Sequence, residues 1–232
     1  MIGCWFKKAK ALSSWLTHPE LGHLPFKNFI MLTALQCYHV LDQSINDYHL
    51  TDSPDSKIRN PYPDSTLEAL LYHKNRIDTV QWHLEDLIRD PAIDPAAAVI
   101  LKRRIDKSNQ DRTDIVEKID DYFLAEFKSV QLIPGAKQNS ETPAWLLDRM
   151  SILLLKIYHM QEQVDRKDAD LNHVARCQAK LNVLLEQKTD MQLCFDELMD
   201  DLQKGIRKMK VYRQMKMYND SSLNPVLYTI KK

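Results

Sequence analysis

The stretch that most constrains the fold runs from Asp94 to about Lys128, with one proline at its start and no glycine. Asp94 followed by Pro95 is a helix start, because aspartate caps the first amides and proline fits the first helical position. Isolated helices are marginal in water and gain most of their stability by packing an apolar face. A helix of this length therefore predicts neighbours of similar length.

The rest of the chain has the same character. Only four glycines occur, and no run of alternating apolar and polar residues predicts a strand. Ser65 with Glu68 predicts a capping box, and Thr142 before Pro143 predicts another helix start. We predict an all-α bundle of about five or six long helices, with loops near 50–64 and 129–142. The expected helices span 2–17, 26–48, 65–90, 95–128, 143–166, and 170 to beyond 210.

The expected domain organisation is a basic amphipathic extension at 1–24 and a single helical-bundle domain at 25–232 with a basic C-terminal segment. The four cysteines show no CxxC spacing, which favours a reduced chain without a zinc cluster. Apolar runs such as Met150 to Leu155 are far shorter than the roughly 20 residues that span a bilayer. We expect a cytoplasmic protein, with membrane-peripheral association as the alternative.

An arginine interrupts the apolar face of the 95–128 helix. At 100° per residue, Arg112 falls in the middle of the stripe expected to be buried, with Ser108 and Asn109 within about 60° on either side. A guanidinium on a buried face needs a carboxylate or a bound anion. The stripe itself is formed by Leu101, Ile105, Val116, Ile119 and Phe123.

The preceding helix carries a polar stripe centred on Trp82, and the short connection from Pro91 to Pro95 predicts that the two helices are antiparallel neighbours. We therefore expect Glu85 or Asp78 to face Arg112. The helix from 143 is apolar nearly all round and adds a few polar side chains. The candidate ligand-binding residues are Asp78, Trp82, Glu85, Arg89, Asn109, Arg112, Asp148 and Arg149.

Two interpretations of these polar stripes stay open. A buried network of arginine and carboxylates often only fixes the register of packed helices. Converging charged groups are also how helical bundles build ligand sites. The second interpretation predicts an enzyme or a binder of a small anion of phosphate or nucleotide type, held by the arginines.

A metal site is a weaker hypothesis. Glu85-Asp86 and Glu117-x-x-Asp120 resemble the acidic motifs of all-α nucleotide pyrophosphohydrolases, which hold Mg²⁺, although Arg89 stands where that pattern has a third acid. Four histidines precede an acid by three residues: His39/Asp42, His49/Asp52, His83/Asp86 and His159/Glu162. The candidate ligands for Mg²⁺ or Mn²⁺ are His39, Asp42, Asp86, Glu117 and Asp120.

Both ends of the chain are basic, although 32 basic and 32 acidic residues balance overall. These ends suggest a second function, that of a non-catalytic adaptor or membrane-peripheral accessory protein bound to an anionic membrane or an acidic partner. Solvated cations near a helix end would look the same. The residues concerned are Lys7, Lys8, Lys10, Lys204, Arg207, Lys208, Lys210, Arg213 and Lys216.

Several long motifs resemble a known family. They include "NPYP" (60–63), "LLYHKNRIDTVQWHLEDLIRDPAIDP" (70–95), "LKRRIDKSNQDRTDIVEKID" (101–120), "ETPAWLLDRMSILLLKIYHM" (141–160) and "KMYNDSSLNPVLY" (216–228). Together they resemble the bacterial domain-of-unknown-function family 4254 over roughly residues 35 to 228. The resemblance implies a single domain and brings no activity, cofactor or catalytic residue with it. Genes of this family often lie near glycosyltransferases for envelope polysaccharide, so the resemblance implies a setting in envelope glycan assembly.

Overall fold

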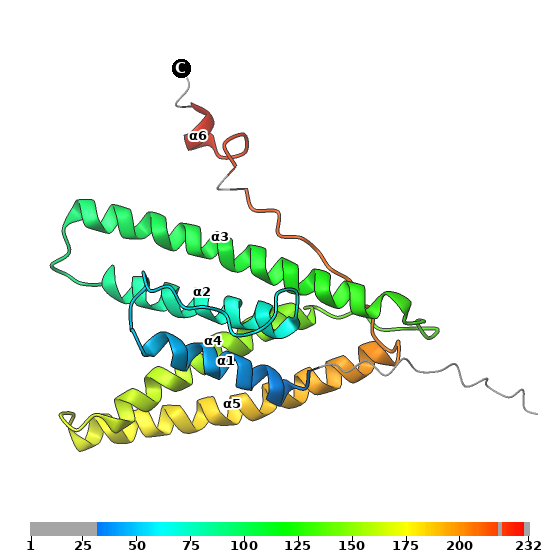
Figure 1. Cartoon of the computed structure of the whole chain (residues 1–232), viewed down its shortest axis with the longest axis horizontal. Coiled ribbons are helices and arrows are strands. Elements are labelled where there is room, and N and C mark those ends of the chain that lie inside the picture. Colours follow the sequence, from blue (N-terminus) through cyan, green and yellow to red (C-terminus); the bar gives the residue numbers. More distant parts are fainter. Residues whose placement is uncertain (1–31, 218–219, 230–232) are drawn as a thin grey trace, which may run out of the picture. The chain divides into compact units, whose positions relative to one another are not determined.

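The long helix that starts after Asp94 is the third of six helices in a computed structural model that describes residues 32–217 and 220–229. The described part of the chain is all-α, as predicted, and it contains no β-strand (Figure 1). The helices are α1 (Ala34–His49), α2 (Leu67–Leu87), α3 (Pro95–Glu126), α4 (Pro143–Asp165), α5 (Leu171–Gln203) and the short α6 (Pro225–Thr229), with a 3-10 turn at Phe127–Ser129 after α3.

Helix α4 packs against α1, α2, α3 and α5, which places it at the centre of the bundle. Its composition explains this position, because apolar side chains occur on nearly every side and a helix of that kind is stable only when surrounded. Ala144, Met150, Leu153 and Leu154 are all buried in the main core. The polar residues of α4 that point inward therefore have to be satisfied by neighbouring helices.

Local capping signals place the helix starts with one exception. Asp94 and Thr142 cap α3 and α4 as predicted, with side chains that accept from the Ala97 and Trp145 amides. The predicted cap at Ser65 is wrong. Thr66 accepts from the Ala69 amide at 3.1 Å, whereas Ser65 has a left-handed φ of 70° that ends the preceding loop.

Helix α1 starts later than predicted. Thr33 and Gln36 form a reciprocal capping box, so the first helical residue is Ala34 and residues 32 and 33 are not helical. Residues 26–31 of the predicted 26–48 helix lie outside the described part of the chain. So do the predicted extension at 1–24, its 2–17 helix, and the cations Lys7, Lys8 and Lys10.

Helix α5 ends at Gln203 and does not continue past 210 as predicted. Gly205 has φ +68° and lies so close to Gln131 that an added Cβ would be 2.1 Å from the Gln131 carbonyl oxygen. Only glycine fits a left-handed position with such a close approach. The chain then turns and passes along α3 as an extended segment, residues 206–217, which we call the C-terminal strap (Figure 1).

Helix α2 buries polar as well as apolar side chains. Lys74, Asn75, Asp78 and Thr79 are buried, and so are Leu67, Leu71, Tyr72 and Leu84. An amphipathic surface helix normally buries apolar residues alone. Because α2 packs between α3 and α4, its inward polar residues meet the polar residues of both neighbours, and the candidate site lies there.

Candidate functional site

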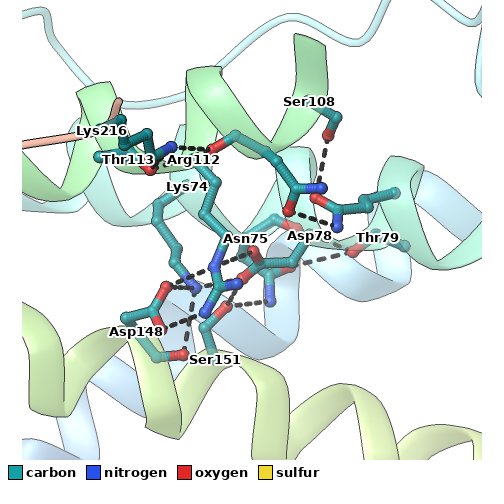
Figure 2. Close-up of polar contacts among 12 residues, drawn as sticks. Lys74, Asn75, Asp78, Thr79, Ser108, Arg112, Thr113, Asp148, Ser151 and Lys216 are labelled. Atoms are coloured by element: carbon teal, nitrogen blue, oxygen red, sulfur yellow. Dashed lines mark hydrogen bonds and ion pairs between the residues drawn. The ribbon is translucent and has the colours of Figure 1, made fainter. Parts of the chain in front are cut away.

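Four charged side chains from three helices meet inside the bundle (Figure 2). Lys74 and Asp78 come from α2, Arg112 from α3 and Asp148 from α4; we call them the buried ion cluster. The side chains of Lys74, Asp78 and Asp148 are 1%, 2% and 3% exposed, and that of Arg112 is 29% exposed. Two cations therefore face two carboxylates almost without water, and Arg112 alone reaches toward the surface.

The ion pairs share partners. Lys74 Nζ contacts Asp78, lies 2.9 Å from Asp148 Oδ1 and donates to the Asp148 carbonyl oxygen at 3.1 Å. Arg112 grips Asp148 with two donors, Nε to Oδ1 at 2.8 Å and Nη2 to Oδ2. Its Nε also lies 3.7 Å from Asp78 Oδ1. The bidentate geometry makes Asp148 the fixed anchor of Arg112, since paired N–H donors match a carboxylate.

Neutral side chains complete one side of Asp78 and leave the other side open. Ser151 donates to Asp78 Oδ2 at 2.6 Å, and Asn75 donates to Ser151 Oγ at 3.0 Å. Asp78 Oδ1 is buried and has no hydrogen-bond partner among the described residues. A buried polar atom without a hydrogen bond costs about 1 to 3 kcal/mol, so this oxygen, 3.7 Å from Arg112 Nε, is suited to accept a hydrogen bond from a group outside the chain.

The environments of the two carboxylates move their pKa values in opposite directions. Burial raises the pKa of Asp78, and the nearby Lys74 only partly offsets this effect. Burial also acts to raise the pKa of Asp148, but the hydrogen bonds from Arg112 and the charge of Lys74 outweigh it and lower the pKa. Asp148 therefore stays ionised, and Asp78 is the member of the cluster that gains a proton most readily.

A pocket of about 260 Å³ opens beside the ion cluster between α2, α3 and α4. Five predicted ligand-binding residues line this Arg112 pocket, namely Asp78, Trp82, Glu85, Arg89 and Arg112. Gln81, Asp86, Ile152 and Leu155 complete the wall. Glu85 and Arg89 form an ion pair of 3.0 Å, which leaves Asp78 and Arg112 as the charged groups at the buried end.

The remaining predicted residues take different positions. Asn109 does not line the pocket; its Oδ1 accepts a hydrogen bond from Nε2 of the lining residue Gln81 at 2.9 Å. Asp148 does not line the pocket, but it accepts two hydrogen bonds from Arg112 and so fixes the guanidinium. Arg149 points away from the site and pairs with Glu141 at 2.7 Å, so the structure does not bring it together with the others. Of the two expected partners of Arg112, Asp78 is near it, but Glu85 pairs with Arg89 instead.

Sequence reasoning missed Lys74 and Ser151. Lys74 falls about 80° from Trp82 on a helical wheel, just outside the stripe of polar residues around that tryptophan. Its spacing of four residues from Asp78 was the available signal, because such pairs face each other on a helix. Ser151 carried no comparable signal, since a single serine on an apolar helix usually bonds to its own backbone.

Histidines gather on the other side of Trp82. His159 stacks on the Trp82 ring at 4.6 Å and holds Glu162 through Nδ1 at 2.8 Å. His49 stacks on Tyr158, bonds Asp52 at 3.2 Å, and lies edge-on to His159. Two of the four predicted histidine–acid pairs are thus bonded and adjacent, whereas His39 and Asp42 are exposed on α1.

The candidate metal ligands are dispersed. Asp86 is exposed on α2, Glu117 accepts from the Gln214 amide, and Asp120 is buried one turn further along α3. Burial raises the pKa of Asp120. Within residues 32–217 and 220–229, no group of three or more histidine, cysteine, aspartate or glutamate side chains is arranged to hold a metal ion.

Most of the C-terminal cations contact the protein itself. Lys204 pairs with Asp200, Arg207 with Asp201, and Arg213 with Asp121. Lys216 donates to Thr113 Oγ1 and to the Asn109 carbonyl, one on each side of Arg112 along α3. Lys210 lies 4.9 Å from the centre of the Tyr212 ring, and Lys208 is exposed. Arg213 and Lys216 therefore hold the C-terminal strap on α3, whereas Lys204 and Arg207 pair with acids of α5.

Comparison with known proteins identifies the family. No helix in the described part of the chain is both long and apolar enough to cross a membrane. No curated protein and no solved structure matches the chain. A family model described as "Protein of unknown function (DUF4254)" matches residues 68–211, which include α3, α4, α5 and nearly all of α2. This match covers more than half of the chain, and the protein therefore belongs to the DUF4254 family.

Proposed function

We propose that the protein binds a small anionic ligand, with a phosphate or carboxylate group, in the Arg112 pocket. The observation that carries this proposal is Arg112, whose guanidinium is fixed by two hydrogen bonds to Asp148 and is 29% exposed on the wall of the Arg112 pocket. Ligand sites in helical proteins are typically concave and carry a few convergent polar groups on a mainly apolar wall. Trp82, Ile152 and Leu155 supply the apolar wall here.

The charge of the ion cluster depends on Asp78. With both carboxylates ionised, Lys74 and Arg112 are balanced and the cluster is neutral. Burial raises the pKa of Asp78, so this carboxylate is the first of the two to gain a proton as the pH falls. With Asp78 protonated, the cluster carries one net positive charge and Asp78 becomes a hydrogen-bond donor. Arg112, which is 29% exposed, presents further donors to the same space.

A purely structural network is the competing interpretation, because buried ion pairs can fix helix register without a ligand. Two features favour binding over register alone. A network built only for register is expected to give each buried oxygen a hydrogen bond, whereas Asp78 Oδ1 has only the 3.7 Å ion pair with Arg112 Nε and no hydrogen bond among the described residues. The arginine of the cluster is also the member that reaches an open pocket, where an anion can approach it.

A thermal-shift assay with inorganic phosphate, AMP and UDP-glucose tests the proposal. A ligand at one hundred times its Kd stabilises a protein by about 2.7 kcal/mol, equivalent to a Tm increase of about 5 to 10 °C in a chain of this size. Arg112→Lys keeps the charge beside Asp148 but loses the paired donors. Ile152→Trp fills the pocket and leaves the ion cluster intact. Arg149→Lys is the matched control outside the pocket.

We expect at least one probe to raise the Tm of the wild type and of Arg149→Lys, and to have little effect on Ile152→Trp. Arg112→Lys should need a higher concentration of that probe for the same shift. An equal shift in Ile152→Trp would place the ligand elsewhere, and the proposal would then be wrong.

A further inference from the structure

A second and larger pocket lies on the other side of Trp82. It has a volume of about 620 Å³ and is bounded by α2, α4 and α5; we call it the α5 pocket. Trp82, Met160, Val183 and Leu184 give it an apolar wall. Val183 is an apolar residue that is 63% exposed. Exposed apolar side chains that gather in a concave site indicate contact with an apolar group.

Two lysines also line the α5 pocket. Lys156 from α4 and Lys180 from α5 line it, with Asp86 as the acid among the lining residues. Lysine can cover an apolar chain with its own methylenes and keep its ammonium group at the water boundary. An apolar wall combined with an excess of positive charge is complementary to a molecule with a hydrocarbon part and a negative charge.

The α5 pocket and the Arg112 pocket adjoin each other. Trp82 and Asp86 line both of them. On α4, Leu155 lines the Arg112 pocket and the next residue, Lys156, lines the α5 pocket. The Trp82 ring is held in place by stacking on His159. The two pockets are therefore close enough for one elongated molecule to contact both.

We infer that the ligand is an amphiphilic anion, with its charged head in the Arg112 pocket and its hydrocarbon chain in the α5 pocket. This inference rests on the proposed function, since it extends the ligand of that same site. The buried end supplies Arg112 and Asp78 for the head, and the apolar wall from Trp82 to Val183 covers the chain. Lys156 and Lys180, which line the α5 pocket, add electrostatic attraction for the negative charge of the ligand.

Calorimetric titration with methyl, butyl and octyl sulfate tests the inference, with each compound kept below its micelle concentration. Sulfate is a tetrahedral oxyanion whose charge is constant at neutral pH. Each buried methylene should strengthen binding about fourfold, the equivalent of about 0.8 kcal/mol. The four additional methylenes of octyl sulfate should therefore make it bind the full-length protein up to about 200-fold more tightly than butyl sulfate does.

Variants on α5 test whether the hydrocarbon chain of the ligand lies in the α5 pocket. Val183→Asp and Val183→Trp should both abolish the gain from butyl to octyl sulfate and leave methyl sulfate binding unchanged. Val183 is exposed, so neither substitution disturbs the core. Leu193→Asp, at an exposed position of the same helix that does not line the α5 pocket, is the matched control and should retain the full gain.

The outcomes separate this inference from the proposed function. Equal affinity for all three sulfates would overturn the inference and leave anion binding intact. A gain with chain length that both Val183 variants retain would also overturn it. Absence of binding at every chain length would refute the proposed function itself. Phosphatidylglycerol vesicles distinguish a bilayer lipid from a free amphiphile: vesicle binding that octyl sulfate displaces supports the inference, and vesicle binding that it does not displace contradicts it.

Discussion

Replacing Lys74 with methionine should destabilise the protein by about 3 to 5 kcal/mol, the usual cost of removing one partner from a buried ion pair. Methionine has a similar length, so the change removes the charge and creates little empty space. Lys74 Nζ contacts both buried carboxylates and the Asp148 carbonyl oxygen. Without it, Arg112 alone faces two acids, and Asp78 has to remain protonated or unpaired.

A double variant separates the stability lost through the missing charge from the stability lost through altered packing. The double variant Lys74→Met/Asp78→Asn restores a neutral cluster, because Arg112 and Asp148 still balance each other. Asparagine keeps an oxygen that accepts from Ser151. We therefore expect the double variant to be about 2 kcal/mol more stable than Lys74→Met, within the range of coupling energies found for residues in one network.

Urea unfolding followed by circular dichroism measures both variants. With a slope of about 2 kcal/mol per molar urea, Lys74→Met should lower the midpoint by about 2 M. Lys107→Met removes an exposed cation paired with Asp111 and should change stability by about 0.5 kcal/mol or less. A cost below about 1 kcal/mol for Lys74→Met, or a double variant no more stable than the single one, would refute the role assigned to the cluster.

Three further predictions follow from the site and the fold. Methyl sulfate should bind more tightly as the pH falls through the raised pKa of Asp78, and Asp78→Asn should remove that dependence, as measured by calorimetry. Gly205→Ala should cost several kcal/mol in thermal unfolding, more than Gly135→Ala, because only the first places a Cβ against backbone. Thr66→Ala should cost about 1 kcal/mol and Ser65→Gly should be neutral or stabilising in the same assay.

The pH dependence of stability has a defined sign at the two carboxylates. Asp78 has a raised pKa in the folded state, so its contribution is fully present below its unfolded pKa and is lost as the pH rises through the folded value. Asp148 has a lowered pKa, so its contribution is present above the unfolded pKa and is lost as the pH falls. Asp78→Asn should remove the first effect and leave the second.

The helical fold was predictable because its signals are local. Asp94, Thr142 and the prolines after them define helix starts through contacts within one turn. Where two local signals competed, the prediction was wrong by a residue, as at Ser65 and Thr66. The end of α5 was missed because Gly205 is required by the approach of Gln131, a contact with a distant part of the chain.

The candidate site was predictable in position and not in pairing. Helical periodicity placed Arg112 on the inner face of α3, and burial of its stripe follows from the same arithmetic. Its main partner depends on how α3 crosses α4, which periodicity does not determine. Asp148 and Arg149 are neighbours in sequence, yet one is buried and the other is 56% exposed. On a helix that is apolar nearly all round, the pattern gives no basis for choosing between them.

The inward polar face of α2 has a consequence for how the fold is chosen. Apolar residues fix the rotation of this helix only in part, because Leu71 and Leu84 are buried whereas Leu87 is 43% exposed. Lys74 and Asp78 add to the selection, since on any other side of the helix they would lose their contacts with Asp148 and Arg112. Apolar replacements throughout the ion cluster should then leave a helical protein that has lost its unique rotational state, detectable as broadened side-chain resonances and not as unfolding.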